Sequence, residues 1–372
     1  MTTIARKQRS LLANLDWTLF ISMLMICCFG LSVLYSAGYN PETGQSYQMK
    51  KQLYAMCVGT VAFLIAMSLN PTFFKRWAWV FYGLALFALA LLDFGGITVK
   101  GSRRWLDLGS FRMQPSEFMK LGIILAFARY FDDDNFPHEG LTFKTLLLPL
   151  IILFVPVVLI LVQPDLGTAL VNTAIGGTML LLVGIRPKTL LILIFTGCLA
   201  LIPAWSMLKD YQRERVVNFL NPENDPLGTG YHAIQSKIAV GSGGLTGKGF
   251  LQGTQTQLSF LPEETTDFIF SVLAEERGFV GTALALILYG FLVFHALGIA
   301  ERSSDRFSAL VVVGVAAMLF WHVVMNIGMV IGLLPVVGVT LPLLSYGGSS
   351  VVTIMSGLGL VAGIRMRRFL FS

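Results

Sequence analysis

Asp267 stands where a long polar stretch of the sequence returns to an apolar run, DFIFSVLAEE. A carboxylate that enters an apolar environment has its charged form disfavoured, and its pKa then rises toward the range that suits a general base. Thr265, Thr266 and Asp267 are also residue types that cap helices ahead of apolar runs. We therefore give equal weight to two roles for Asp267, general base and helix cap, which can coexist.

A second ionisable set, Glu117 and Lys120, lies inside an apolar run that follows Pro115 and Ser116. Proline suits the first turn of a helix, and residues at i and i+3 share one helix face. Ionisable side chains inside a membrane span are costly and indicate function by default. The pair can also neutralise itself, so a structural salt bridge is the leading interpretation and the lining of a cavity is the alternative.

A third set, Gln163, Pro164 and Asp165, occupies a short turn between two apolar runs. A tight turn needs proline and aspartate for its geometry alone. The expected topology, however, places Asp165 on the same side of the membrane as Asp267, which makes a shared function worth testing.

These sets border a long polar stretch, Asp210 to Phe270, which is too polar to cross a bilayer. Its glycine run GSGGLTGKG, residues 241–249, lacks P-loop spacing, because Ser242 and Gly249 stand where the pattern requires Gly and Ser or Thr. The backbone N–H groups of such a run could bind phosphate as a nest, although a flexible turn between two short helices is the simpler interpretation. Four basic residues of the stretch could hold a diphosphate: Arg213, Arg215, Lys237 and Lys248.

The composition is that of a membrane protein. The 372 residues are 55% hydrophobic and only 13% charged, with a mean hydropathy of +0.72, which excludes an ordinary soluble domain. The first apolar block, Leu19 to Ala37, is too long for the core of a signal peptide, so we keep it as a span. The four cysteines lie inside apolar runs, and neither they nor the four histidines have zinc-ligand spacing. We expect no disulfide framework and no tight transition-metal site.

Ten apolar runs come close to the ~20 residues that cross a bilayer as a helix. We therefore predict an all-α polytopic membrane protein: a single transmembrane domain, residues 1–372, with about ten transmembrane helices. One large extracytoplasmic loop, residues 209–277, lies between spans seven and eight. The predicted spans are residues 17–37, 53–69, 77–94, 115–131, 143–162, 166–184, 187–208, 278–299, 308–332 and 345–364.

An even number of spans puts both termini on one side of the membrane. Basic residues flank the N-terminus, several turns and the C-terminal tail, and the positive-inside rule makes those faces cytoplasmic. The large loop then lies outside. The excess of Lys and Arg on the cytoplasmic side is small, because the outer loops are basic too. The most basic of them for its length is the loop 100–112, KGSRRWLDLGSFR, which suits either headgroup contact or ligand binding.

Several stretches together resemble the SEDS family of shape, elongation, division and sporulation proteins. They follow one another over almost the whole chain as KGSRRWLDLG, QPSE, QPDLGT, YQRERV, DPLGTGYH, QSKIAVGSGG, LTGKGFLQGTQ, FLPEETTDFIF, AEERG and LPVVGVTLPLLSYGGSS. Several long motifs in one order are far more specific than any single one. Within the family, GKGFLQGTQTQ is more similar to the elongation member than to the division member.

This resemblance implies a ten-span glycosyltransferase of the cytoplasmic (inner) membrane that polymerises lipid II into peptidoglycan on the outer face. The 4-hydroxyl of an acceptor GlcNAc would attack the anomeric carbon of a MurNAc linked to undecaprenyl diphosphate. Because an α-diphosphate becomes a β-1,4 link, one inverting displacement is expected. Such a step needs a base on the hydroxyl, and cations or a divalent metal, Mg²⁺ or Mn²⁺, on the departing diphosphate.

The resemblance also assigns residues. The essential loop aspartate of the family falls on Asp267 through the match LPE-x-x-TDFIF, and we expect it to be the general base. Relatives often carry His at the position of Thr265, so this chain lacks the imidazole for a proton relay there. The sequence identifies no metal ligands. The expected substrate-binding residues are Arg213, Arg215, Lys237, Gln163, Asp165, Glu117, Lys120, Arg104 and Ser349.

A partner follows from the same resemblance: a class B penicillin-binding protein, whose transpeptidase crosslinks the new glycan within the cell-elongation machinery. The sequence contains no transpeptidase domain of its own, which agrees with such a division of labour. We expect no nucleic-acid partner.

Two other functions fit parts of the sequence. A transporter or flippase of the lipid-linked precursor would also have many spans, intramembrane charges and a diphosphate ligand. A candidate base on the outer face separates the two interpretations, because a flippase does not require one. A scaffold that only recruits partners would leave Asp267 dispensable.

Overall fold

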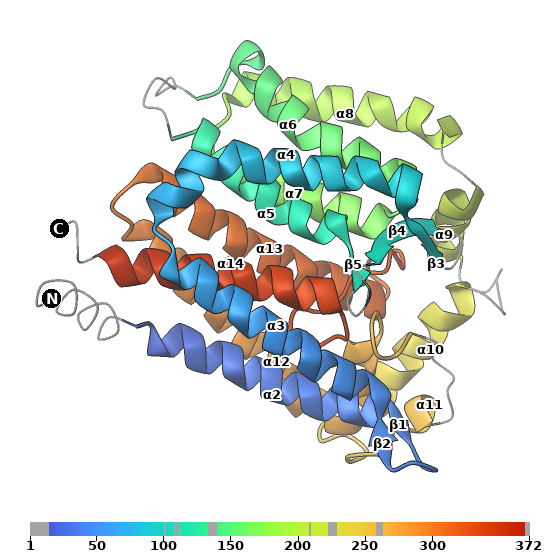
Figure 1. Cartoon of the computed structure of the whole chain (residues 1–372). Helices are drawn as coiled ribbons and strands as arrows, with labels where there is room; N and C mark the ends of the chain where they lie inside the picture. Colours follow the sequence, from blue (N-terminus) through green and yellow to red (C-terminus); the bar gives the residue numbers. More distant parts are fainter. Residues whose placement is uncertain are drawn as a thin grey trace, which may run out of the picture.

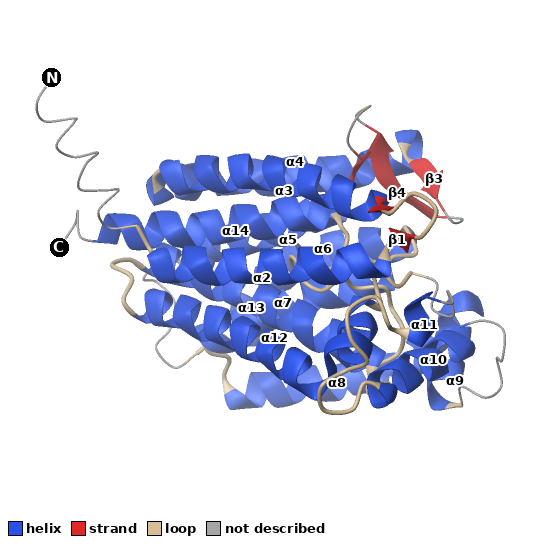
Figure 2. Cartoon of the chain, turned by 90° about the horizontal axis from the view of Figure 1, so that it is seen from below, coloured by secondary structure: helices blue, strands red, loops and turns tan. Residues whose placement is uncertain are grey.

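The computed structural model describes residues 15–99, 102–107, 109, 112–132, 140–207, 210–221, 229–257 and 263–368. Its long helices lie side by side in one bundle, and short helices and strands gather at one end of it (Figure 1, Figure 2). The helices are α2 (Trp17–Ala37), α3 (Tyr47–Ser68), α4 (Pro71–Gly95), α5 (Pro115–Tyr130), α6 (Phe143–Val162), α7 (Leu166–Val183), α8 (Pro187–Met207), α9 (Asp210–Leu220), α10 (Thr229–Ser242), α11 (Thr254–Gln257), α12 (Ile269–Glu301), α13 (Arg306–Val330) and α14 (Gly348–Arg367).

Two small antiparallel sheets lie at the same end as the short helices (Figure 2). One is a hairpin of two strands, and the other has the order β3-β4-β5. The strands are β1 (Tyr39–Asn40), β2 (Gln45–Ser46), β3 (Ile97–Val99), β4 (Ser102–Asp107) and β5 (Arg112–Met113). The second sheet therefore contains most of the basic loop 100–112, including Arg104.

Eight of the described helices are long and apolar enough to cross a membrane, which confirms a polytopic all-α membrane protein. α5, with 16 residues, and α8, with a shorter apolar stretch at Pro187–Leu199, complete the predicted set of about ten. The predicted spans 17–37 and 143–162 coincide with α2 and α6. Others begin too late because their first turns are polar: α3 starts at Tyr47, where Ser46 Oγ caps the helix by accepting from the N–H of its third residue.

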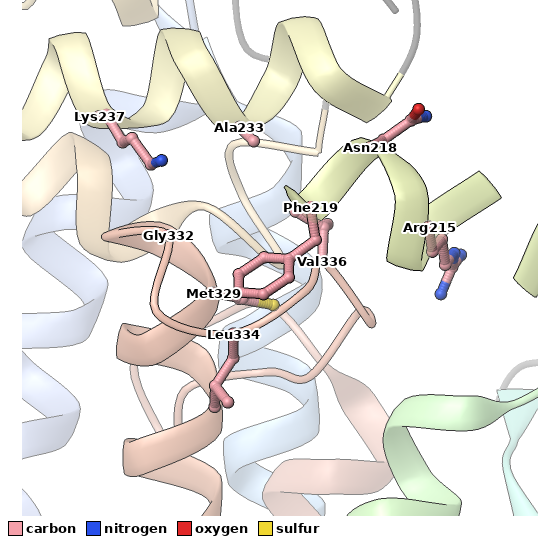
Figure 3. A pocket seen from close by; sticks show the side chains of 9 residues that line it. All are labelled: Arg215, Asn218, Phe219, Ala233, Lys237, Met329, Gly332, Leu334 and Val336. Carbon is pink, nitrogen blue, oxygen red and sulfur yellow. The ribbon is translucent and has the colours of Figure 1, made fainter. Parts of the chain in front are cut away.

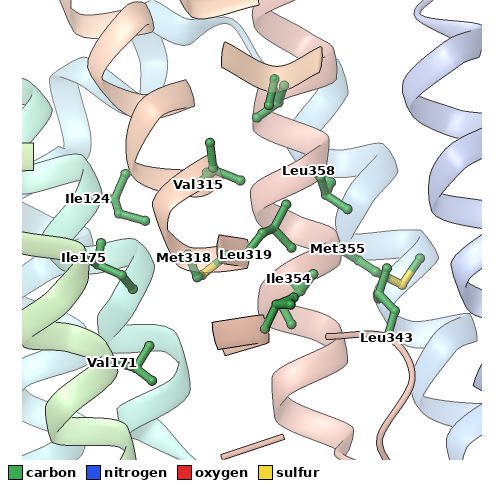
Figure 4. Packing of buried hydrophobic residues seen from close by; sticks show 14 of the residues in the cluster. Ile124, Val171, Ile175, Val315, Met318, Leu319, Leu343, Ile354, Met355 and Leu358 are labelled. Carbon is green, nitrogen blue, oxygen red and sulfur yellow. The ribbon is translucent and has the colours of Figure 1, made fainter. Parts of the chain in front are cut away.

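The hydrophobic core lies between α5, α7, α13 and α14 (Figure 4). α13 and α14 are the most enclosed spans, with 72% and 89% of their most apolar window buried, against 17% for α4 at the outside of the bundle. The core side chains shown include Ile124 of α5, Val171 and Ile175 of α7, Val315 of α13 and Ile354 of α14. Polar side chains that point into this core are buried, and burial without a partner is costly.

α12 is interrupted at Gly278, whose φ of 61° and ψ of −160° are not helical. Residues 243–249, which we call the glycine clasp, replace the lost hydrogen bonds. Two N–H groups of the clasp donate to α12 carbonyls before the break, and the first two N–H groups after the break donate to carbonyls of the clasp, at 2.9–3.1 Å. The clasp must be glycine-rich, because a Cβ on Gly247 would lie 2.1 Å from a carbonyl oxygen of α12. Broken helical backbone at membrane depth is tolerated only when it is satisfied in this way.

The predicted loop 209–277 is largely helical, because it contains α9, α10, α11 and the first turns of α12. α10 packs against the bundle, where Ser236 Oγ donates to the carbonyl of Val330 at the end of α13, at 2.7 Å. The polar stretch is thus a folded layer over one end of the bundle (Figure 2).

The start of α2 and the end of α14 meet at the opposite end of the bundle (Figure 1). Asp16 Oδ2 lies 2.7 Å from His295 Nε2 and 2.9 Å from Arg365 Nε. The first and last described helices therefore have their outer ends on the same side, as an even number of spans predicts.

Candidate active site

Asp267 ends a turn, residues 263–267, that leads into α12. The carbonyls of residues 265–267 each accept one hydrogen bond from α13 or from the segment after it, at 2.6–2.9 Å. The donors are Tyr346 N–H, Ser345 Oγ and Asn326 Nδ2. Since three successive peptide groups are held from outside the turn, the backbone of Asp267 is fixed relative to α13.

The Asp267 carboxylate lies against Gly338, in the loop 331–347 between α13 and α14. A Cβ on Gly338 would come within 3.2 Å of Asp267 Oδ2, and the φ of Gly338 is +75°, which glycine adopts without strain. Asp267 is partly exposed. It does not cap α12, because Phe268 is the N-cap and no side chain makes a cap hydrogen bond there. The helix-cap interpretation is therefore wrong.

Asp165 is a buried, fully engaged carboxylate. Its Oδ1 caps α7 by accepting from an N–H of the first turn at 3.2 Å, and its Oδ2 accepts from Gln114 Nε2 at 3.0 Å. Arg104 lies beside it, with Nη1 3.9 Å from Asp165 Oδ1, and its Nε donates to the carbonyl of Gln163 at 3.2 Å. The Gln163 side chain in turn donates to a carbonyl of α4 at 2.8 Å. This group ties the second sheet to the α6–α7 turn.

Ser349, in the first turn of α14, continues this group. Its Oγ accepts from the N–H of Gln114 at 2.9 Å and donates to the carbonyl of Arg112 at 3.2 Å. Gln114 thus links Asp165 to Ser349, and polar contacts run from α7 through the start of α5 to α14.

Glu117 and Lys120 form the predicted salt bridge, with Lys120 Nζ donating to Glu117 Oε1 at 2.6 Å. Lys120 Nζ also lies 2.7 Å from His322 Nε2, and His322 Nδ1 lies 3.1 Å from the carbonyl oxygen of Thr340. A carbonyl can only accept, so the imidazole proton belongs on Nδ1 and Nε2 accepts from the ammonium. All three side chains are buried. The network is a neutral histidine and one compensated ion pair, which suits an apolar interior.

The loop 331–347 connects this network with Asp267. Carbonyls of two consecutive residues of the loop accept hydrogen bonds from Asn326 and His322, which lie one turn apart on α13. The start of α7 packs on the loop as well, since a Cβ on Gly167 would lie 2.5 Å from one of its carbonyl oxygens. The Asp267 carboxylate and the Asp165 group therefore contact the same loop.

A small hollow lies between α9, α10 and the end of α13 (Figure 3). Arg215 and Lys237 line it from opposite sides, and Val336 forms part of its wall. Arg213 also belongs to α9 but is not among the lining residues. Two residues beyond Val336 the chain reaches the contact with Asp267. Two of the four basic residues predicted for a diphosphate thus line one hollow, whose wall includes a residue of the loop that contacts the candidate base.

The FtsW, RodA and SpoVE family, described as cell cycle proteins, matches residues 16–369 of the chain. The chain belongs to this family. Peptidoglycan glycosyltransferase MrdB of Escherichia coli is 41% identical to it over 361 residues, which cover 96% of this chain and 95% of that protein. Peptidoglycan glycosyltransferase RodA of Treponema pallidum is 32% identical, and the alignment covers 96% of this chain and 98% of that protein. The SEDS resemblance is confirmed.

Solved structures share the fold of this SEDS protein. The crystal structure of the rod shape determining protein RodA of Thermus thermophilus matches with a TM-score of 0.70 and 30% identity, over 95% of this chain and 98% of that one. A chain from a structure described as the structural coordination of polymerization and crosslinking by a peptidoglycan synthase complex matches with a TM-score of 0.81 and 33% identity, over 95% and 98%.

The glycine run of this SEDS protein is not a phosphate nest. The N–H groups of residues 247–249 donate to carbonyls of the clasp and of α12, at 2.8–3.0 Å, and so cannot face a phosphate. Lys248 Nζ donates to Glu275 Oε1 at 2.7 Å. Lys248 therefore neutralises a buried carboxylate and does not join Arg215 and Lys237 at the hollow.

Glu264, in the same turn as Asp267, has a strongly shifted pKa. Burial, and to a lesser extent the charge of Glu275, raises the pKa of Glu264 to about 8. Its Oε2 has no hydrogen-bond partner among the described residues. Glu264 is consequently protonated at neutral pH, and it places no second negative charge beside Asp267.

Sequence reasoning for this SEDS protein missed His322 and Asn326. Neither residue has a role among the predictions from the sequence. Both are polar residues in the middle of an apolar run, four positions apart, and therefore on one helix face. That pattern is the signal that could have found them, because a polar residue in a span indicates a buried partner.

Proposed function

We propose that this SEDS protein is a peptidoglycan glycosyltransferase that polymerises lipid II into β-1,4 glycan strands during cell elongation. The observation that carries the proposal is the Asp267 carboxylate, which is partly exposed and held on a fixed backbone. It lies against Gly338, in the same loop as Val336 of the hollow that Arg215 and Lys237 line. Relatives that are 41% and 32% identical over nearly the whole chain are named peptidoglycan glycosyltransferases, which supports the same activity here.

Asp267 acts as the general base in this proposal. Its carboxylate takes the proton of the acceptor 4-hydroxyl while that oxygen forms a bond to the anomeric carbon of the donor MurNAc. The bond from that carbon to the diphosphate oxygen breaks in the same step, and undecaprenyl diphosphate leaves with the electron pair. Attack opposite the leaving group converts the α-diphosphate into a β-1,4 link. General-base catalysis contributes typically about 10²–10⁴-fold to such a rate.

The other predicted residues divide into contact and support roles. Arg215 and Lys237 line the hollow, and Arg213 lies on the same helix, so we assign them to the diphosphate, for which guanidinium groups provide bidentate contacts. The side chains of the remaining residues form hydrogen bonds with other groups of the protein. We assign these to the support of the site: Arg104, Gln163, Asp165, Ser349, Glu117 and Lys120.

A divalent cation, Mg²⁺ or Mn²⁺, is proposed as an additional ligand of the diphosphate. No group of three His, Cys, Asp or Glu side chains converges within the described part of the chain. Mg²⁺ usually keeps several waters and binds through one or two carboxylates plus substrate phosphates, so such a cluster is not required. When bound, the cation would neutralise charge on the departing diphosphate.

We place the end of the bundle with Asp16 and Arg365 in the cytoplasm of the cell and the layer of α9–α11 outside the inner membrane. Both termini are then cytoplasmic and the active site faces outward. Basic residues near the first end, Arg302, Arg306 and Arg368, support this orientation under the positive-inside rule.

We further propose a class B penicillin-binding protein as the partner that crosslinks the glycan, within the elongation machinery. The match to a chain from a structure described as a peptidoglycan synthase complex, at a TM-score of 0.81, supports this partner.

A lipid II flippase is the second candidate, because intramembrane charges mark the substrate paths of many transporters. Glu117, Lys120 and His322 are buried and their charges are balanced within the group, so no transported ligand is needed to neutralise them. This favours the polymerase.

The test is polymerisation of lipid II in detergent by the purified protein with its cognate class B penicillin-binding protein. We expect the wild type to make polymer and Asp267→Asn to lose this activity while the complex stays intact. Glu42→Gln is the matched control, because Glu42 is an exposed carboxylate on the β1–β2 turn, and it should polymerise normally. Full-length polymer from Asp267→Asn would refute the general-base role. Transfer of lipid II across vesicle membranes without polymer would favour the flippase.

A further inference from the structure

Asn326 binds two separate segments of the site with one amide group. It is fully buried on α13, and its Nδ2 donates to the carbonyl of Asp267 at 2.9 Å and to the carbonyl of Val339 at 2.7 Å. The first carbonyl belongs to the turn before α12 and the second to the loop before α14. A single side chain therefore links these segments at Asp267 itself, next to the bonds that Ser345 and Tyr346 donate to the two preceding carbonyls of the turn.

The orientation of this amide follows from its partners. Both partners are carbonyl oxygens, so only the NH₂ end of Asn326 can face them, and a flipped amide would place Oδ1 against two acceptors. Oδ1 itself is buried without a hydrogen-bond partner among the described residues. Leaving a buried acceptor unpaired is unfavourable. Burial of this side chain therefore costs free energy at Oδ1, while its Nδ2 donates two hydrogen bonds to the site.

These two bonds determine where the Asp267 carboxylate lies. Asp267 is held directly through its own carbonyl. Val339 is bonded to Gly338, the residue against which Asp267 Oδ2 packs. Asn326 therefore holds both sides of the contact between the carboxylate and the loop. The neighbouring carbonyl, that of Thr340, is held by His322 in the same manner.

We infer that Asn326 is a positioning residue for Asp267, which fixes the carboxylate against Gly338 so that it meets the acceptor hydroxyl in a reactive geometry. This inference rests on the proposed function for its catalytic part. Its structural part does not, because the cross-link between the two segments is independent of any substrate. Small displacements of a catalytic group lower the rate of the chemical step more than they lower substrate binding.

Asn326→Leu tests the inference, because leucine has a similar size and no donor. Asn326→Asp is the second variant: it keeps the shape and replaces the donating NH₂ by an acceptor. Asn172→Leu is the matched control, since Asn172 is also fully buried, but its Nδ2 donates to a carbonyl of its own helix, at 2.8 Å. Each variant is purified with its penicillin-binding partner and compared with wild type in thermal unfolding, hydrogen exchange by mass spectrometry and polymerisation kinetics.

We expect faster exchange in peptides that cover residues 263–268 and 338–346 for both Asn326 variants, with unchanged exchange there for Asn172→Leu. The kcat of polymerisation should fall about 10–100-fold, with KM for lipid II within a factor of about two. Unchanged exchange in both peptides would overturn the inference, and so would faster exchange with normal kcat. Failure of both Asn326 variants to fold would show a structural role and count against it as well. If exchange rises but wild type makes no polymer, the cross-link stands and the proposed function fails.

Discussion

Asp267 and Glu275 are two carboxylates only eight positions apart in the same segment, and the structure treats them in opposite ways. Glu275 is fully buried, and its oxygens accept from Lys248 Nζ, Thr254 Oγ1, Gln255 N–H and Thr256 Oγ1 at 2.7–3.3 Å. Asp267 is partly exposed, and the hydrogen bonds that fix its position go to its backbone and to its neighbours' carbonyls.

This difference separates a structural carboxylate from a chemical one. A carboxylate whose lone pairs are occupied by protein donors is held in its charged form and cannot approach a substrate proton. A carboxylate that is partly exposed and stands on a fixed backbone has a defined position that a substrate hydroxyl can reach. The segment that leads into α12 contains one carboxylate of each type, and only the surrounding contacts distinguish them.

The largest expected difference between the two carboxylates is the change in stability when each is replaced by its neutral amide. Glu275→Gln leaves Lys248 without its partner and should lower the free energy of unfolding by about 3 kcal/mol, as breaking a buried pair does. Chemical or thermal denaturation in detergent measures this. Asp267→Asn, whose loss is in kcat, should shift the unfolding midpoint by no more than about 1 °C. Equal destabilisation by both substitutions would abolish the distinction.

A smaller effect is expected from the clasp that holds Glu275. Gly278→Ala puts a Cβ at φ +61°, where it would lie 2.3 Å from the N of Gly247, and should lower the free energy of unfolding by about 2 kcal/mol. The control is Gly290→Ala in the same helix, where a Cβ meets nothing within 4 Å; it should be neutral or stabilising by about 0.5–1 kcal/mol. Equal stabilities for the two alanine variants would mean that the break carries no strain.

The smallest effect concerns Glu264, a third carboxyl in the same region. Its pKa is about 8 in the folded protein against 4.5 for an ordinary glutamate, so between these values the folded state holds a proton that the unfolded state has lost. The contribution of Glu264 to the free energy of unfolding therefore falls as the pH rises from the lower to the higher of these two pKa values. Glu264→Gln removes the ionisation and should raise the unfolding midpoint at pH 9 relative to pH 5.

The gain should be on the order of 1 kcal/mol after solvent screening, or about 1–3 °C. Glu42→Gln controls for the change in net charge. The same midpoint difference between pH 5 and pH 9 for Glu264→Gln and wild type would show that Glu264 is ionised in the folded state.

Much of the fold could be predicted from the sequence because apolar runs of bilayer length have few alternatives. The spans at α2 and α6 were found to the residue. Helix ends were less accurate, since polar first turns such as that of α3 carry no hydropathy signal. The break in α12 was also hidden, because the hydrogen bonds that compensate for it come from residues 243–249, about 30 positions earlier.

For the site, residue type and local spacing correctly predicted the Glu117–Lys120 salt bridge. The same reasoning preferred a turn to a phosphate nest for the glycine run, but it did not predict that amides of the run pair with α12 carbonyls, which no local pattern reveals. It left Asp267 undecided between cap and base, and this depends on contacts from Asn326, Ser345 and Tyr346, all of which lie far along the chain. Long-range pairing is the information that a single sequence does not display.

The glycine clasp also bears on how the chain enters the membrane during synthesis. Residues 243–249 precede α12 in the chain, so they are synthesised before the segment with Gly278. The peptide groups freed at Gly278 can therefore find their partners as soon as they arrive, instead of waiting unpaired in lipid, where each would be costly. The order of translation and the order of hydrogen bonding coincide at this point. A clasp placed after α12 in the chain would have left the break unprotected until that later segment had been made.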